Sequence, residues 1–217
     1  MSARLAALCT VLSFGIFTGR AEPVSSPNRK VAVYLQNGSS PNNIRTVPYL
    51  KLEVEALMQS AGYKVEWNIP GQPVDDGVLV VVDLRGSCSV SGANSLVKPV
   101  KNGASLASTA VEGDQVLPFS WISCETLTGL LAPSLAGIAS AERDSLYGRA
   151  MGRILAHELY HILANEREHS QSGVGKSSFT ASDVLGENFL FEGSALASLT
   201  REPNPPDAPT SAEDADQ

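Results

Sequence analysis

The sequence predicts an α+β protein, in which a mixed, twisted sheet is covered by a backing helix and by a longer helix that carries the candidate functional residues. Strand-like and helix-like hydrophobic patterns alternate over the first half of the chain, as at the start of an α/β layer. The second half contains one long helical pattern, and all three histidines lie in or just after it. The 217 residues suffice for one ordinary domain with processing segments.

The composition indicates a globular chain and does not favour nucleic acid as a partner. Hydrophobic residues make up 43% of the sequence, charged residues 18%, and the formal net charge is −7. Because no basic block or basic-aromatic pattern is present, nucleic acid is not an expected partner. The acidic balance bears on solubility and not on fold. We expect a monomer.

The N-terminus has the pattern of a signal peptide spanning residues 1–21. Arg4 gives a short basic start, and residues 5–17 form an apolar run too short to span a bilayer. Small residues at the right offsets predict cleavage after Ala21, although an uncleaved anchor or a buried helix is the alternative. Cleavage predicts a secreted or periplasmic protein without stable membrane insertion, with its domain in residues 22–200.

Two cysteines remain once the leader, with Cys9, is removed. An even pair in an exported chain favours one disulfide, here between Cys88 and Cys124. Closing a loop of about 35 residues is worth roughly 3–4 kcal/mol in the chain-entropy model. The alternative, metal binding by these cysteines, is disfavoured because neither has a cysteine or histidine nearby at zinc-ligand spacing.

Three strands and one helix are expected in the first half. Residues 30–35 and 63–67 read as strands, and residues 46–61 between them have apolar positions at helical spacing. Residues 78–84 form a continuous β-branched run, which predicts a strand buried on both faces. A long Gly- and Ser-rich loop is expected over residues 85–101.

Two further strands are expected at residues 105–111 and 115–121, around a turn signal. One of them is expected to be the sheet edge that lines a cleft, and a simple structural hairpin is the alternative. Residues 124–131 predict a short apolar helix or turn.

The longest helix is predicted over residues 141–164, with Ser140 as its N-cap. Gly148 and Gly152 each cost about 1 kcal/mol in a helix interior. We expect them where this helix packs closely on the sheet, and the alternative is that the helix simply tolerates the two glycines.

The remainder of the chain predicts little regular structure. Residues 170–178 form a Gly- and Ser-rich loop, and residues 180–191 predict a last short helix capped by Ser182. Residues 201–217 are rich in proline and acidic residues and predict a disordered tail.

His157, Glu158 and His161 form a His-Glu-x-x-His pattern on the long helix. An α-helix advances 1.5 Å and 100° per residue, so residues four apart lie about 6 Å apart on one face, which suits two imidazoles that converge on one zinc ion. Glu158 borders this face, where a carboxylate can take a proton from a metal-bound water. The alternative is a surface helix with incidental histidines.

A catalytic zinc needs a third protein ligand and one open position. His169 is the expected third ligand. On a straight helix it would lie about 12 Å beyond His161, too far to share a metal. The helix must therefore end near residues 164–166 and turn back, and Asn165 tolerates the left-handed conformation that stops helices.

Residues 156–161, Ala-His-Glu-Leu-Tyr-His, resemble the active-site helix of zincin metallopeptidases. The third histidine after a turn resembles the metzincin branch, and the order strand, helix, strand, strand is similar to the metzincin N-terminal half. The stretch from 148 to 169 also resembles uncharacterised exported bacterial proteins of zincin type. The resemblance implies a zincin-like fold, a Zn2+ cofactor, and a peptide or protein substrate.

The chain departs from the metzincin pattern in two ways. Metzincins have glycine three residues past the second histidine and the third histidine three residues later, where this chain has Ala164 and Arg167, and its histidine follows two residues further on at His169. All three methionines precede His169, so the family's methionine turn beneath the metal is missing. Leu190 or Phe191 is expected to floor the site instead.

An acidic third ligand, as in the gluzincin branch, is the alternative to His169. Glu187 and Glu192 lie downstream, but neither sits in a helix with the expected aspartate partner. Tyr160 is expected in the core, and Asp183 is expected to be a cap or loop residue.

These features predict a secreted zinc metallopeptidase, with a metalloendopeptidase as the first expectation. His157, His161 and His169 would hold the metal, and Glu158 would be the general base. The alternatives are a non-catalytic zinc-binding or adhesion module on the same scaffold, because fold does not dictate function, and an amidase of cell-wall peptides.

Overall fold

The computed structural model describes four stretches of the chain: residues 29–69, 71–74, 77–89 and 105–201. The predicted signal peptide, most of the loop predicted at 85–101, and the predicted tail from residue 202 onward lie outside the described residues.

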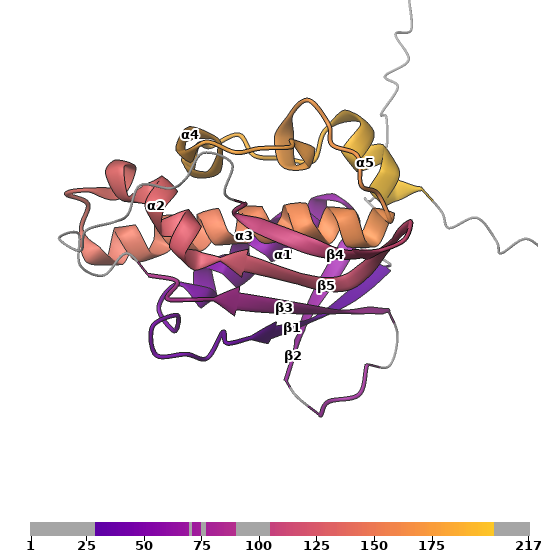
Figure 1. Ribbon diagram of the computed structural model, residues 1–217, viewed down its shortest axis with the longest axis horizontal. Helices are drawn as coiled ribbons and strands as arrows, with labels where there is room; N and C mark the ends of the chain where they lie inside the picture. The colour runs from indigo at the N-terminus through magenta and orange to yellow at the C-terminus, as the bar shows by residue number, and fades with distance from the viewer. Residues whose placement is uncertain (1–28, 70, 75–76, 90–104, 202–217) are drawn as a thin grey trace, which may run out of the picture.

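Five strands form one mixed sheet in the order β2-β1-β3-β5-β4 (Figure 1). Its strands are β1 (Arg29–Gln36), β2 (Tyr63–Asn68), β3 (Val78–Arg85), β4 (Ala107–Glu112) and β5 (Gln115–Ser123). The pairs β1–β2, β1–β3 and β3–β5 are parallel, whereas β4 runs antiparallel to β5 and forms one edge of the sheet. The predicted α+β class with a mixed sheet is therefore confirmed.

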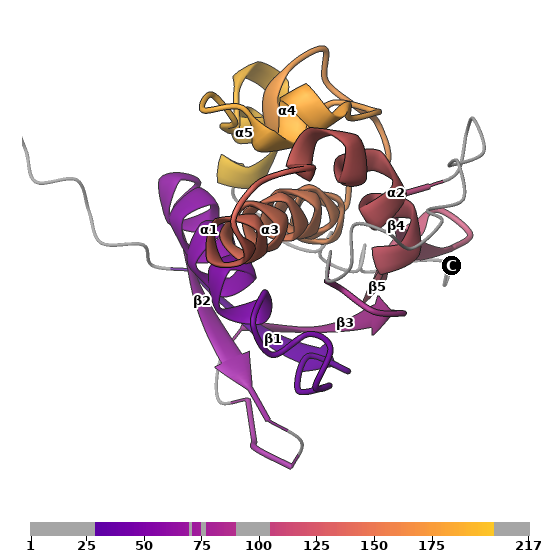
Figure 2. The same ribbon diagram turned by 90° about the vertical axis from the view of Figure 1, so that its left-hand side faces the viewer.

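The helices lie on one side of this sheet (Figure 2). They are α1 (Val47–Ser60), α2 (Cys124–Leu135), α3 (Ser140–Ala164), α4 (Ala181–Leu185) and α5 (Gly193–Thr200), with a 3-10 turn η1 at Gly173–Gly175. Helices α1 and α3 lie side by side, and the segment with α4 and α5 lies on the side of α3 away from the sheet (Figures 1 and 2). In the part of the chain that is described, no helix has the length and hydrophobicity needed to cross a membrane.

The core forms where the periodic apolar positions of the helices meet those of the sheet. Helix α1 buries residues at the helical spacing seen in the sequence, namely Val47, Leu50, Val54, Leu57 and Met58. In the sheet, Val31 and Val33 of β1 are buried, as are the alternate residues Val80, Val82 and Leu84 of β3. Each such side chain contributes about 1.5–3 kcal/mol by leaving water, and together they fix which face of the sheet carries the helices.

The expectation that β3 is buried on both faces is wrong. Val78 and Leu79 are exposed and Val81 and Asp83 are only partly buried, whereas the residues between them are buried. The cause is the one-sided helix layer: among the described elements, no helix covers the other face of the sheet. A run of β-branched residues does not by itself distinguish these two environments.

Gly148 and Gly152 pack against α1 and not against the sheet as predicted. A Cβ atom on Gly148 would lie 2.3 Å from the carbonyl oxygen of Thr46, and one on Gly152 would lie 2.7 Å from Cβ of Glu53. The missing side chains therefore let the backbones of α1 and α3 approach closely.

Two predictions about helix ends are also wrong. Ser140 is the first residue of α3, and its N-cap is Ala139, which makes no side-chain cap. Helix α4 is capped by Thr180 and not by Ser182, and it ends at residue 185, so the predicted helix over 180–191 is too long. The sequence reading also missed α5.

The disulfide between Cys88 and Cys124 is present, as predicted. It ties the chain after β3 to the first residue of α2, and both cysteines are fully buried. The side chain of Asn43 accepts a hydrogen bond from the Cys88 N–H at 2.8 Å, and the Thr46 hydroxyl donates to the Cys88 carbonyl at 2.8 Å. These bonds fix the loop before α1 to the disulfide.

Candidate metal site

His157 and His161 lie on the same face of α3 near its end, as their spacing predicts. Both are buried, with 7% and 8% of their surface exposed. Their Nε2 atoms are 3.0 Å apart, and the rings meet edge to face. The two Nε2 atoms are therefore close enough together to bind one metal ion.

Backbone carbonyl groups orient the two imidazoles. Nδ1 of His157 donates to the carbonyl oxygen of Val174 at 2.7 Å, and Nδ1 of His161 donates to that of Glu166 at 2.6 Å. Since a carbonyl oxygen can only accept, each Nδ1 carries the proton and each Nε2 keeps its lone pair. The backbone carbonyl groups of Val174 and Glu166 thus orient the two imidazoles, and the sequence did not indicate either of them.

His169 reaches the same point because the chain reverses after α3. Asn165 ends the helix in the left-handed conformation, with φ 47° and ψ 45°, as predicted. Its side-chain oxygen accepts a hydrogen bond from the N–H of Val116 at 3.0 Å, which fastens the turn to β5. The His169 ring then stacks on His157 at 5.3 Å and meets His161 at 4.8 Å between centroids.

The ligand nitrogens of His157, His161 and His169 all lie within 4.8 Å of one another. Tetrahedral coordination at bond lengths of 2.0–2.1 Å places nitrogen ligands about 3.4 Å apart, so small ring rotations bring three imidazoles onto one ion. Lone pairs of His157 and His161 that face each other at 3.0 Å repel unless a cation contacts both. The donor set therefore fits a metal ion.

Burial keeps His157 and His161 in the form that binds metal. It lowers the pKa of His157 to about 3, with a further contribution from the neighbouring His161. Burial also lowers the pKa of His161, against the opposing effect of its bond to the Glu166 carbonyl. Neutral imidazole is the ligand form, so His157 and His161 can bind a metal ion at neutral pH.

The acidic alternatives do not join this cluster. Within the described residues, the three histidines are the one group of His, Cys, Asp or Glu side chains close enough together to hold a metal ion. Glu192 instead accepts a hydrogen bond from the Ser172 hydroxyl at 3.0 Å. Tyr160 is buried, as predicted, and its hydroxyl donates to the Glu168 carbonyl within the turn.

Glu158 lies beside the histidines at the bottom of a cleft. Only 4% of its surface is exposed, and burial raises the pKa of its carboxyl to about 7, against the lowering effect of a hydrogen bond from Thr109. The Thr109 hydroxyl donates to Oε2 of Glu158 at 2.5 Å. No local sequence signal indicates Thr109, because its position depends on how β4 pairs with β5.

The cleft runs between β4 and the chain that follows α3. A pocket of about 340 Å³ in this cleft is lined by Ala107, Ser108 and Thr109 of β4, by Ser177, and by the three histidines and Glu158. The prediction that one of the two strands lines a cleft is therefore correct for β4.

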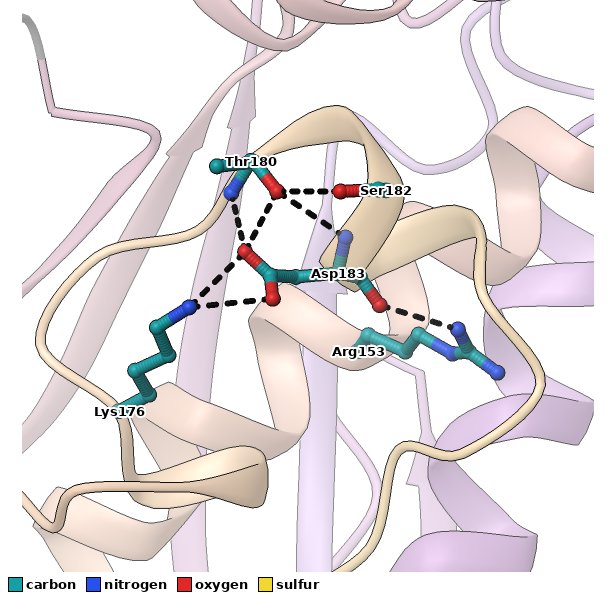
Figure 3. Close-up of polar contacts among 5 residues, drawn as sticks. All are labelled: Arg153, Lys176, Thr180, Ser182 and Asp183. Carbon is teal, nitrogen blue, oxygen red and sulfur yellow. Dashed lines mark hydrogen bonds and ion pairs between the residues drawn. The ribbon is translucent and has the colours of Figure 1, made fainter.

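Polar contacts hold the segment that forms the second wall of this cleft, and Figure 3 shows these contacts among Arg153, Lys176, Thr180, Ser182 and Asp183. Lys176 contacts both carboxylate oxygens of Asp183 at 3.1 Å, and Asp183 forms a reciprocal capping box with Thr180. The cap role predicted for Asp183 is confirmed. The residues between Lys176 and Thr180, namely Ser177, Ser178 and Phe179, line the cleft.

The aromatic ring of Phe179 packs against the site. It meets the His157 ring edge to face at 5.2 Å and also contacts Phe189 at 5.5 Å. Leu190, one of the two residues expected to floor the site, is 53% exposed and does not do so. Phe191 is buried.

Arg153 joins this wall to α3 one turn before His157. It is buried and forms an ion pair with Glu53 of α1 at 2.7 Å. It also donates to the carbonyl group of Asp183 in α4 (Figure 3) and to that of Val184. The buried Arg153 guanidinium group therefore links α3, on which it lies, to α1 and to the segment that forms the second wall.

No family model, curated protein or solved structure matches this chain. The chemistry of the cleft is therefore the basis for assigning a function.

Proposed function

We propose that the protein is an exported, zinc-dependent metallopeptidase. The observation that carries this proposal is a buried carboxylate, Glu158, beside three convergent histidines at the base of an open cleft. A purely structural metal site does not need a carboxylate held there. The mixed sheet with a backing helix and a metal-site helix supports the zincin-like fold that the sequence motif implies.

The chemistry of the ligands favours zinc as the metal. Three neutral imidazoles with one open position are a known catalytic zinc arrangement. A bound zinc ion would lower the pKa of a water in the open position and polarise the carbonyl group of the scissile bond.

Glu158 moves the protons of the reaction. Its carboxylate takes a proton from the attacking water and then gives it to the nitrogen of the leaving amine. A pKa raised by burial to about 7 suits a group that must accept and release a proton near neutral pH.

Strand β4 holds the substrate. It is the last strand of the sheet, and no strand in the described part of the chain pairs with its outer edge. An extended peptide can therefore add to this edge through backbone hydrogen bonds, beside the cleft that β4 and Glu158 line. The disulfide supports an oxidising compartment and hence an exported protein.

The decisive test is Glu158→Gln. The wild type should hydrolyse casein or a peptide library, lose this activity to a chelator and regain it with zinc. The variant should bind zinc with wild-type affinity yet lose at least about 100-fold in kcat, the range of general-base catalysis. If the wild type shows no chelator-sensitive hydrolysis of peptides or of cell-wall peptides, a non-catalytic metal-binding module is the correct reading.

A further inference from the structure

The Glu158 carboxylate has a dedicated hydrogen-bond donor. A buried carboxylate is costly unless it is hydrogen-bonded. Among the described residues, Thr109 is the one side chain that hydrogen-bonds to it, at 2.5 Å from Oε2. That length is typical of a charge-assisted bond between a hydroxyl and a carboxylate.

The sheet fixes where the Thr109 hydroxyl lies. Thr109 pairs in register with Ser120 of β5, and the register shifts between Thr109 and Val111. Such irregularities re-aim side chains and recur near active sites. Threonine is also stiff at χ1 because it is β-branched. The hydroxyl position is therefore set by the fold and does not depend on bound substrate.

We propose that Thr109 is a positioning residue for the general base, which deepens and rests on the proposed function. By holding Oε2, it leaves Oε1 to react. As the oxygen of the attacking water bonds to the carbonyl carbon, Oε1 takes the water proton. The same proton passes to the amine nitrogen as the C–N bond breaks, which yields a carboxylic acid and an amine.

Kinetics of two variants test this role. Thr109→Val keeps the β-branched shape and removes the hydroxyl, so kcat should fall about 10- to 100-fold while KM stays within about threefold, as expected for a misaligned catalytic group. Thr109→Ser keeps the hydroxyl and should stay within about threefold of the wild-type kcat. Equal kcat in Thr109→Val and wild type, or equal losses in both variants, overturns the proposal.

Thr128→Val is the matched control. It deletes a threonine hydroxyl that is hydrogen-bonded to the Tyr147 hydroxyl at 3.0 Å, on α2 and outside the residues that line the cleft. It should lower stability and leave kcat unchanged. A fall in kcat equal to that of Thr109→Val would show a general effect of lost stability and would overturn the proposal.

A double-mutant cycle tests the contact without any activity assay. Thr109→Val should raise the unfolding equilibrium constant about tenfold in the wild type, where it strands a buried carboxylate, and less than about threefold in a Glu158→Met background. If Thr109→Val changes the unfolding equilibrium constant equally in both backgrounds, the Thr109 hydroxyl does not stabilise the Glu158 carboxylate, and the proposal is overturned. If the wild type has no metal-dependent hydrolysis, the proposed function and the positioning role of Thr109 both fail. Unequal effects of Thr109→Val in the two backgrounds then show that its hydrogen bond to Glu158 is purely structural.

Discussion

At the scale of single residues, burial shifts two neighbouring side chains of the site in opposite directions. It raises the pKa of Glu158 from 4.5 to about 7 and lowers that of His157 from 6.5 to about 3. Between pH 4.5 and 7 the folded chain holds a proton on Glu158 that the unfolded chain has released, so stability falls as pH rises. Between pH 3 and 6.5 the unfolded chain holds a proton on His157 that the folded chain has released, so stability falls as pH drops.

These two effects oppose each other between pH 4.5 and 6.5 in the metal-free protein, and Glu158→Gln separates them. The variant loses the glutamate titration, so it should become more stable relative to the wild type as pH rises from 4.5 to 7, by up to about 3 kcal/mol for a shift of this size. Urea unfolding of both proteins in chelator across this pH range measures the difference. A constant difference between them would contradict a raised pKa for Glu158.

Residues whose position depends on local geometry were predictable, and the others were not. The convergence of His157 and His161 follows from helix geometry, and the turn that returns His169 follows from the tolerance of Asn165 for positive φ. The contacts of Thr109 and Phe179 join segments far apart in the sequence. Periodicity and motif spacing carry no information about such contacts.

At the scale of elements, the close contact between α1 and α3 holds the helix that carries His157 and His161 in place. Gly148→Ala should destabilise the protein by about 1–3 kcal/mol, since the added methyl group would overlap the Thr46 carbonyl, the cost typical of overpacking. Helix propensity alone predicts the opposite sign, a gain of about 1 kcal/mol. Urea unfolding decides between them, and a stabilised variant would contradict the close packing of the two helices.

Elements with strong periodicity were predicted within a few residues, and short elements without it were not. The strands and the two long helices lie where their apolar patterns place them. Helix α5 is short, and its position depends on tertiary contacts such as the bond from the Tyr63 hydroxyl to the Leu199 carbonyl. The element that packs against Gly148 and Gly152 was also predicted wrongly. A glycine in a helix indicates that another element packs closely there, but it does not indicate which element.

At the scale of the whole molecule, the candidate metal site joins three segments of the chain. His157 and His161 come from α3, His169 comes from the turn, and the Val174 carbonyl that orients His157 belongs to η1. The segment from residue 165 to 185 also forms the second wall of the cleft. Metal binding should therefore stabilise this segment more than it stabilises the sheet.

Zinc should raise the melting temperature of the wild type, since a ligand at 1,000 times its Kd adds about 4 kcal/mol. Chelation should reverse the rise, and hydrogen exchange should show the gain in protection mainly over residues 165–185. His157→Ala should abolish the zinc-dependent rise and His169→Ala should reduce it, whereas Glu192→Ala, the matched control for an acidic third ligand, should keep it in full. If Glu192→Ala loses the zinc response and His169→Ala keeps it, the third ligand is the acid and the turn after α3 has another role.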